Sequence, residues 1–93
     1  MKWNEVKLLN NKHDVKVFTL TTCIWCKRVK QLLEKEQCTY KFIDVDLLEG
    51  DDRDIAVNEI KKYINKLSFP LIIIDEDPIQ GYHEKKIRKA VNE

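Results

Sequence analysis

The sequence predicts an α/β domain in which a mixed four-stranded sheet is flanked by about three helices. Three stretches carry this prediction. Residues 15–37 have the pattern of a strand that runs directly into a helix, and residues 39–45 have the pattern of a second strand after a short link. Residues 71–74 form an unbroken run of leucine and isoleucine, which is typical of a buried strand inside a sheet.

The first strand is expected over residues 15–20, where side chains alternate between two faces. The helix that follows is expected over residues 24–37, because three apolar side chains recur there at helical spacing: Val29, Leu32 and Leu33. Thr22 is expected to cap the first turn of this helix, and its neighbour Thr21 could share that role.

The second strand is expected over residues 39–45, with three side chains turned inward: Tyr40, Phe42 and Ile43. A strand, a helix and a strand joined by short links form a βαβ unit, so the two strands are expected to run parallel. Cys38 lies between the helix and this strand. It is either a small buried apolar residue or a third redox-active thiol.

The next segment predicts another helix and an inner strand. Residues 46–52 form an acidic loop centred on Gly50, and a helix is expected over residues 52–66. This helix should carry one buried apolar stripe, formed by Ala56, Ile60, Tyr63, Ile64 and Leu67. Pro70 precedes the apolar run. Because proline cannot donate a hydrogen bond to a sheet ladder, it should occupy the first residue of the strand or a bend.

The C-terminal part is expected to close the sheet. Residues 75–78 predict a turn, and residues 79–80 predict a short returning strand that ends at Gly81. A terminal helix is expected over residues 83–92, with three side chains facing the core: Ile87, Ala90 and Val91.

Residues 1–14 are compatible with two structures, a short strand or an amphipathic helix. Either one would cover an edge of the sheet. His13 is expected in a loop.

The composition describes one small domain spanning residues 1–93. The chain has 17 Lys and Arg against 16 Asp and Glu, a formal net charge of +1. This balance gives no reason to expect nucleic acid or a membrane surface as a partner. The N-terminus lacks the apolar run of a signal peptide, and no apolar stretch is long enough to span a bilayer. We expect a monomer in the reducing cytoplasm, where a cysteine pair is more often catalytic than structural.

Cys23 and Cys26 stand at the junction between the first strand and its helix. Residues three apart in a helix lie on the same side, so the two sulfurs can meet without backbone movement. The Cα separation of such a pair, roughly 5–6 Å, lies within the range that a disulfide accepts. A cysteine pair at a strand-to-helix turn is typical of a thiol–disulfide redox motif.

The position of each thiol predicts its role. Cys23 would lie at the helix N-terminus, where unpaired backbone N–H groups and the helix dipole favour an anion, so it is expected to be the attacking thiolate. Cys26, one turn further on, is expected to be more buried, protonated and the resolving thiol. Trp25 is expected at an exposed docking surface, with core packing as the alternative.

A cysteine pair can also form half of a zinc site. Such a site usually needs a second ligand pair at similar spacing. The remaining candidates, Cys38, His13 and His83, stand apart from one another. We expect no bound metal, and a small zinc-binding interaction module is an alternative.

With this cysteine pair after the first core strand and Ser68-Phe69-Pro70 opening the third, residues 15–92 resemble the glutaredoxin branch of the thioredoxin fold. The resemblance implies a thioredoxin-like fold, to which the N-terminal extension could add an edge strand. Ser68-Phe69-Pro70 matches the family's Thr-Val-Pro position, where the proline is cis and the preceding residue exposes its backbone to a bound peptide or thiol tripeptide. The resemblance implies the following substrate-binding residues: Thr22, Trp25, Ser68, Phe69, Pro70, Gly81 and Tyr82.

Within this family, the chain resembles NrdH-type redoxins and other glutaredoxin-like proteins more than the glutathione-dependent glutaredoxins. Ile24-Trp25 stands where Pro-Tyr or Pro-Phe is usual, and Thr21-Thr22 replaces a lysine that often precedes the motif. The segment from Gly81 to Lys85 replaces the Gly-Gly and Ser/Asp-Asp residues that hold the glutathione carboxylate. These replacements remove family contacts to the tripeptide.

The resemblance implies a dithiol thiol–disulfide oxidoreductase, an electron carrier that reduces protein disulfides through Cys23 and Cys26. It implies no bound cofactor and no strict need for glutathione. The expected partners are disulfide-containing proteins, with ribonucleotide reductase as one candidate, and a protein reductase of the thioredoxin-reductase or ferredoxin-linked type. The alternative is a module that holds an iron–sulfur cluster between two chains, each contributing Cys23.

Overall fold

The computed structural model describes residues 1–93 and contains one five-stranded sheet. Its strands are β1 (Asn4–Val6), β2 (Val15–Thr19), β3 (Tyr40–Asp44), β4 (Leu71–Ile74) and β5 (Asp77–Gln80). Its helices are α1 (Ile24–Lys35), α2 (Gly50–Lys61) and α3 (Glu84–Asn92), with a short 3-10 helix, η1 (Val45–Leu47). The fifth strand is β1, which the N-terminal extension adds to the four strands expected. None of the helices is long and apolar enough to cross a membrane.

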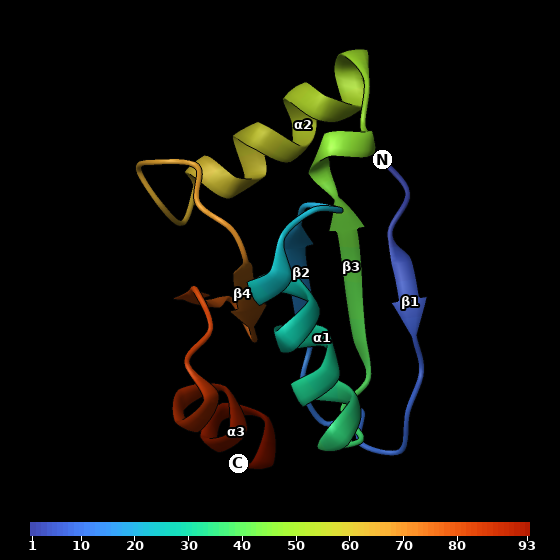
Figure 1. Ribbon diagram of the computed structural model, residues 1–93, viewed down its shortest axis with the longest axis vertical. Helices are drawn as coiled ribbons and strands as arrows, with labels where there is room; N and C mark the ends of the chain where they lie inside the picture. The colour runs from blue at the N-terminus through green and yellow to red at the C-terminus, as the bar shows by residue number, and fades with distance from the viewer.

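The strand order is β1-β3-β2-β4-β5 (Figure 1). β2 and β3 run parallel, as the βαβ unit predicts, and the other neighbours pair antiparallel. In the β2–β4 pair, Phe18 lies opposite Leu71. The end of β2 that leads to Cys23 therefore lies beside the start of β4, which follows Pro70. This pairing brings the two sequence motifs to the same edge of the sheet.

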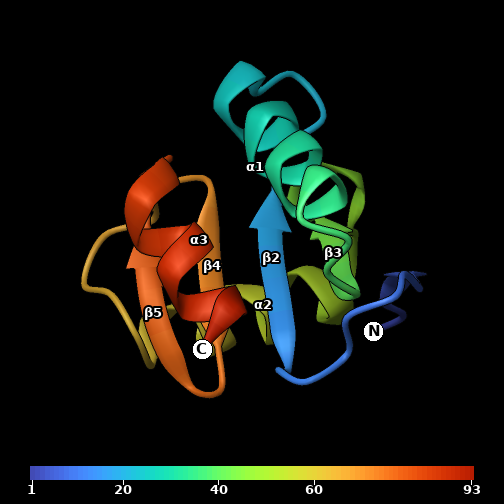
Figure 2. The same cartoon turned by 90° about the horizontal axis from the view of Figure 1, so that it is seen from below.

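Helices cover both faces of the sheet, α1 and α3 on one and α2 on the other (Figure 2). The first core includes Val17, Leu33, Ile72, Ile87 and Val91. The second core includes Phe18, Ile43, Ala56, Ile60 and Leu71. Neighbouring residues of β2 thus enter opposite cores, which confirms the predicted alternation. Two residues expected to face inward, Phe42 and Ala90, pack against the first core but stay partly exposed.

Several expected boundaries are wrong by a few residues. α1 ends at Lys35 rather than residue 37, because the backbone of Gln37 adopts a φ of +55°, which a continuing right-handed helix does not allow. β5 starts at Asp77 rather than residue 79, because the turn is confined to Asp75 and Glu76, with φ values of +48° and +73°.

The extent predicted for the second helix is also wrong. α2 spans Gly50–Lys61 rather than residues 52–66. Tyr63 and Ile64 follow it and still pack partly against the second core. Leu67 is exposed, because the chain has by then left the helix to cross towards β4. Helical spacing therefore continues in the sequence beyond the end of the helix.

The N-terminal residues form a strand, so the alternative of an amphipathic helix is wrong. β1 pairs antiparallel with the outer edge of β3, with Glu5 opposite Lys41. Trp3 packs edge-on against Phe18, with ring centroids 5.1 Å apart. His13 lies in the loop before β2, as expected. Its Nδ1 hydrogen-bonds the Asp75 carboxylate and holds the pKa of that carboxyl below its usual range.

Candidate active site

Cys23 caps α1, and the prediction that Thr22 does so is wrong. The backbone of Cys23 is extended, and its Sγ accepts a hydrogen bond from the Cys26 backbone N–H at 3.2 Å. Because the helix begins at Ile24, Cys23 alone occupies the residue from which a side chain reaches the third N–H of the helix. Thr21 donates instead to Asp46 across the loop, from both its hydroxyl and its backbone N–H, and so lowers the pKa of that carboxyl.

The two thiols of the pair have different surroundings. Cys23 is half-buried at the N-terminus of α1, in a first turn that contains no acidic residue. Cys26 is 1% exposed. Burial, with the hydrogen bond and charge of Cys23 in addition, raises the pKa of Cys26 to about 12. This geometry fits the expected roles, an accessible attacking thiol at Cys23 and a buried, protonated resolving thiol at Cys26.

Cys38 is also 1% exposed, and it belongs to the first core. Burial raises the pKa of its thiol, and the charge of Glu36 adds to that effect. Its surroundings favour a small buried apolar residue over a third redox-active thiol. No three His, Cys, Asp or Glu side chains lie close enough together to share a metal ion.

Reduced protein treated with iodoacetamide at about pH 8 should be labelled at Cys23 alone, because the thiolate is the reactive form and the other two thiols are covered and protonated. Mass spectrometry of tryptic fragments, with tandem spectra to separate Cys23 from Cys26, measures this. Equal labelling of both at about pH 8 would contradict the assigned roles.

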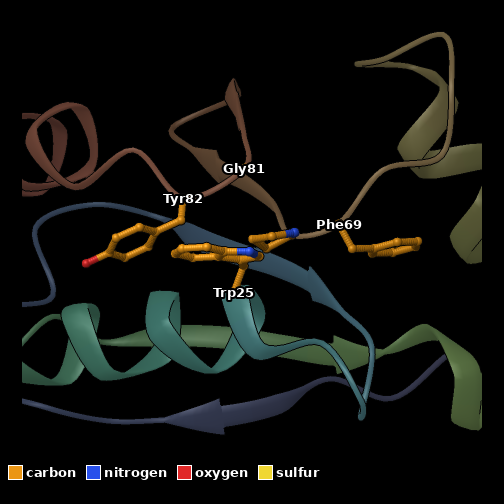
Figure 3. Close-up of a pocket in the computed structure, with 5 residues that line it drawn as sticks. Trp25, Phe69, Gly81 and Tyr82 are labelled. Atoms are coloured by element: carbon orange, nitrogen blue, oxygen red, sulfur yellow. The ribbon is translucent and has the colours of Figure 1, made fainter.

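A cavity of about 200 Å³ is lined by five of the residues predicted to bind substrate: Trp25, Phe69, Pro70, Gly81 and Tyr82. They come from the first turn of α1, the segment before β4 and the segment after β5 (Figure 3). Two pairings hold the segment before β4 and the segment after β5 together. Leu71 lies opposite Gln80 in the sheet, and the Gly81 N–H donates to the Pro70 carbonyl at 2.9 Å.

The groove, as we call this cavity, has an aromatic wall. Trp25 is 53% exposed, so the alternative that it packs in the core is wrong. Its ring stacks on Tyr82, with centroids 5.7 Å apart and an interplanar angle of 29°. The Phe69 ring points away from Trp25 and packs against the second core (Figure 3). The Phe69–Pro70 bond is cis, in agreement with the family resemblance.

Two other predicted site residues are placed differently. Thr22 is exposed and Ser68 is half-buried, and neither lines the groove. Gly81 has a φ of +88°, which favours glycine over any residue with a side chain. Gly81 thus serves the groove by its backbone conformation.

The contact that Arg28 makes with Trp25 was not predicted from the sequence. Its guanidinium lies over the Trp25 ring, 5.3 Å from the centroid, in a cation–π contact. The available signal was spacing, since Trp25 and Arg28 are three residues apart and therefore neighbours on a helix surface.

The glutaredoxin family model matches residues 15–79, from the first residue of β2 into β5. This span contains both cysteines of the pair and the Phe69–Pro70 bond. The chain belongs to the glutaredoxin family. It is similar to Glutaredoxin 1 of Rickettsia bellii (strain RML369-C), with 35% identity over 72 residues, which cover 74% of this chain and 69% of that protein.

Solved structures agree over a longer part of the chain. The glutaredoxin from Methanosarcina mazei Go1 has a TM-score of 0.88 and 33% identity, and the match covers 100% of this chain and 90% of the Methanosarcina mazei chain. The methanoredoxin of Methanosarcina acetivorans has a TM-score of 0.81 and 32% identity, with coverage of 86% and 85%. These comparisons confirm the thioredoxin-like fold. Membership of the family makes the protein a thiol–disulfide oxidoreductase that acts on disulfide substrates.

Proposed function

We propose that this glutaredoxin is a dithiol electron carrier that reduces protein disulfides without strictly requiring glutathione. The contrast between its two thiols carries the proposal. Cys23 is accessible and accepts a hydrogen bond at a helix N-terminus, whereas Cys26 is buried one turn behind it with a pKa of about 12. One thiol is thus placed to attack a substrate, and the other is placed to reach only Cys23.

The reaction follows from thiol–disulfide exchange. The Cys23 thiolate attacks one sulfur of a substrate disulfide, so that a Cys23–substrate bond forms and the other substrate sulfur leaves as a thiolate. Cys26 then attacks Cys23 Sγ and gives up its proton, and the second substrate sulfur leaves. Two electrons pass from the protein to the substrate, and an outside reductant must later reopen the Cys23–Cys26 disulfide.

The surroundings of Cys26 favour this order of events. Burial raises the pKa of Cys26 most, but the hydrogen bond and the charge of Cys23 also contribute. Both contributions change when Cys23 enters the mixed disulfide, because its sulfur then carries no negative charge. Cys26 is therefore more easily deprotonated at the step in which it must attack.

The groove suits an extended protein segment. It is lined by Phe69 and Pro70 and by the exposed Trp25 ring. Backbone pairing supplies affinity in such complexes, and an aromatic side chain supplies contact area. Disulfide-containing proteins, ribonucleotide reductase among them, are accordingly the substrates that we propose.

Two features of the groove support independence from glutathione. Glu84 lies in the first turn of α3, and His83 at its cap makes no side-chain cap hydrogen bond. A carboxylate at a helix N-terminus makes that end less favourable for a second anion such as a glutathione carboxylate. Tyr82 follows Gly81 and stacks on Trp25. Buckwheat glutaredoxin, solved as a glutathione complex, shares 27% identity and a TM-score of 0.62 with this chain.

A carrier that starts each cycle as a dithiol needs a reducing compartment. We therefore place it in the cytoplasm, acting as a monomer, with a thioredoxin-reductase-type or ferredoxin-linked enzyme as its reductant.

The test compares three reductants on the oxidised protein: glutathione, a thioredoxin-reductase-type enzyme and a ferredoxin-linked thiol reductase. We expect faster reduction of the Cys23–Cys26 disulfide by one of the two enzymes than by glutathione at cellular concentration. A Cys38→Ser variant serves as a control and should behave as the wild type, because Cys38 is buried. Rapid turnover by glutathione alone would contradict independence from glutathione. Failure of all three would contradict the carrier function.

A further inference from the structure

One face of α1 carries positive charge that the protein does not neutralise. Lys27, Arg28 and Lys35 are exposed, and none forms an ion pair within the molecule. Lys30, on another side of the helix, pairs with Asp44. Unpaired cations therefore extend along this face from beside the thiols to the far end of α1, although the whole chain has a net charge of only +1.

The carboxylates nearest this face are already engaged. Glu84 pairs with Arg88 at 3.5 Å, and Glu34 accepts a hydrogen bond from the Tyr40 hydroxyl at 2.7 Å. The acidic first turn of α2 lies on the opposite face of the sheet. The charge around the thiols is therefore uneven, with cations on the α1 side and acids on the α2 side.

This face of α1 is hollowed and continuous with the groove. A hollow of about 170 Å³ is lined by Tyr82, which also lines the groove, by Arg28, Gln31, Leu32 and Lys35, and by Glu84, whose charge Arg88 pairs. A second hollow of about 200 Å³ is lined by Ile24, Lys27, Arg28 and Gln31. A segment bound in the groove can pass over Tyr82 onto this face. We call the five residues Ile24, Lys27, Arg28, Gln31 and Lys35 the basic strip.

Two features make the basic strip a docking surface rather than a solvated helix face. Arg28 is held over the Trp25 ring, which is itself stacked on Tyr82, so its guanidinium is positioned beside the groove. Ile24 is 61% exposed next to the thiols, an apolar contact with no partner in the protein. Apolar and arginine anchors beside a groove are typical of protein-binding sites.

We propose that the protein substrate presents an acidic segment that lies along the basic strip while its disulfide meets Cys23. This inference rests on the proposed function and names the class of substrate. From Ile24 to Lys35 the helix rises by about 16 Å, which equals about five residues of extended chain. Glutathione, a tripeptide, is too short to span the basic strip from Ile24 to Lys35. Arg28 and Lys35 lie two turns apart, so two carboxylates about three residues apart match them.

The experiment uses three small peptides, each with one internal disulfide and a tail of about five residues. The tails are rich in aspartate, in serine or in lysine. Pre-reduced protein is mixed with each peptide in a single turnover. At low salt, we expect the aspartate tail to react about fivefold to tenfold faster than the lysine tail, with the serine tail between them. High salt should reduce this difference, because it screens exposed charges.

Two charge-reversal variants locate the effect. The Arg28→Glu/Lys35→Glu variant should lose or reverse the ratio of rates between the aspartate-tailed and lysine-tailed peptides. The Lys7→Glu/Lys12→Glu variant has the same net charge. Its substitutions flank β1 and β2 at the end of the sheet opposite the thiols, as the register of β1 on β3 and of β2 on β3 shows. It should keep the preference.

Equal rates of reduction of the three peptides by the wild type would contradict an acidic partner segment. An equal loss of the preference for the aspartate tail in both charge-reversal variants would also contradict it. If no peptide is reduced, the proposed function fails. The inference about the basic strip is then tested by the binding of the peptide tails alone. Titration of cysteine-free versions of the tails, followed by tryptophan fluorescence, should show tighter binding of the aspartate tail to the wild type than to the Arg28→Glu/Lys35→Glu variant. Equal binding would overturn the proposal.

Discussion

Replacing Cys23 with serine should abolish disulfide reduction, and replacing Cys26 with serine should leave substrate covalently attached to Cys23. A serine hydroxyl is not ionised near neutral pH, so Cys23→Ser removes the nucleophile. Cys26→Ser leaves the accessible Cys23 thiolate able to attack but removes the buried thiol that releases the substrate. The loss in the first variant should amount to several orders of magnitude in rate.

Mass spectrometry of each variant after mixing with a disulfide peptide measures the outcome. The Cys26→Ser protein should gain the mass of one half of the peptide, and the Cys23→Ser protein should gain none. Cys38→Ser is the matched control and should reduce the peptide as the wild type does, because Cys38 is buried away from the reaction. The roles would be reversed if the Cys23→Ser variant trapped substrate.

Leu33→Ala should lower the free energy of unfolding by about 2–5 kcal/mol. Leu33 is 0% exposed and belongs to the core through which α1 packs on the sheet. Removing its side chain takes apolar contacts away and leaves a cavity that the rigid sheet beneath cannot fill. This loss is a large part of the stability expected for a domain of this size, about 5–15 kcal/mol.

Urea unfolding followed by circular dichroism measures this effect. Leu9→Ala provides a matched control, because Leu9 is 87% exposed and its loss should change stability by less than about 0.5 kcal/mol. An equal change in both variants would show that α1 is not held to the sheet through Leu33.

The order of the strands and helices could be predicted from local patterns. The alternation in β2, the helical spacing in α1 and the apolar run of β4 each give a local signal, and the short link between α1 and β3 limits the topology to a parallel pair. The thiol pair was equally predictable, because its chemistry depends on spacing and on its place at a helix start.

Features that depend on distant contacts were not predictable. Residues 1–14 suit a strand or a helix equally in sequence. Only the free edge of β3 and the contact of Trp3 with Phe18 select the strand. The N-cap residue of α1 was also not predictable, because both Thr22 and Cys23 can accept a backbone hydrogen bond. The helix begins at Ile24, and this start makes Cys23 the cap.

The residues of the groove were only partly predictable. Its residues were proposed from a family resemblance, and the structure brings five of them together through the β4–β5 pairing. Thr22 and Ser68 lie outside it, since proximity in sequence to a site residue does not ensure that a side chain faces the site. The contact of Arg28 with Trp25 depends on a side-chain conformation and emerged only from the structure.

The most direct test of the dithiol mechanism is the state of the wild-type cysteines after one turnover with a disulfide peptide. The tryptic fragment that ends at Lys27 contains both Cys23 and Cys26, and Cys38 lies in another. The mechanism predicts that this fragment loses two hydrogens, as a Cys23–Cys26 disulfide forms, and that Cys38 stays a free thiol. A stable mixed disulfide on Cys23 beside a free Cys26 would contradict it.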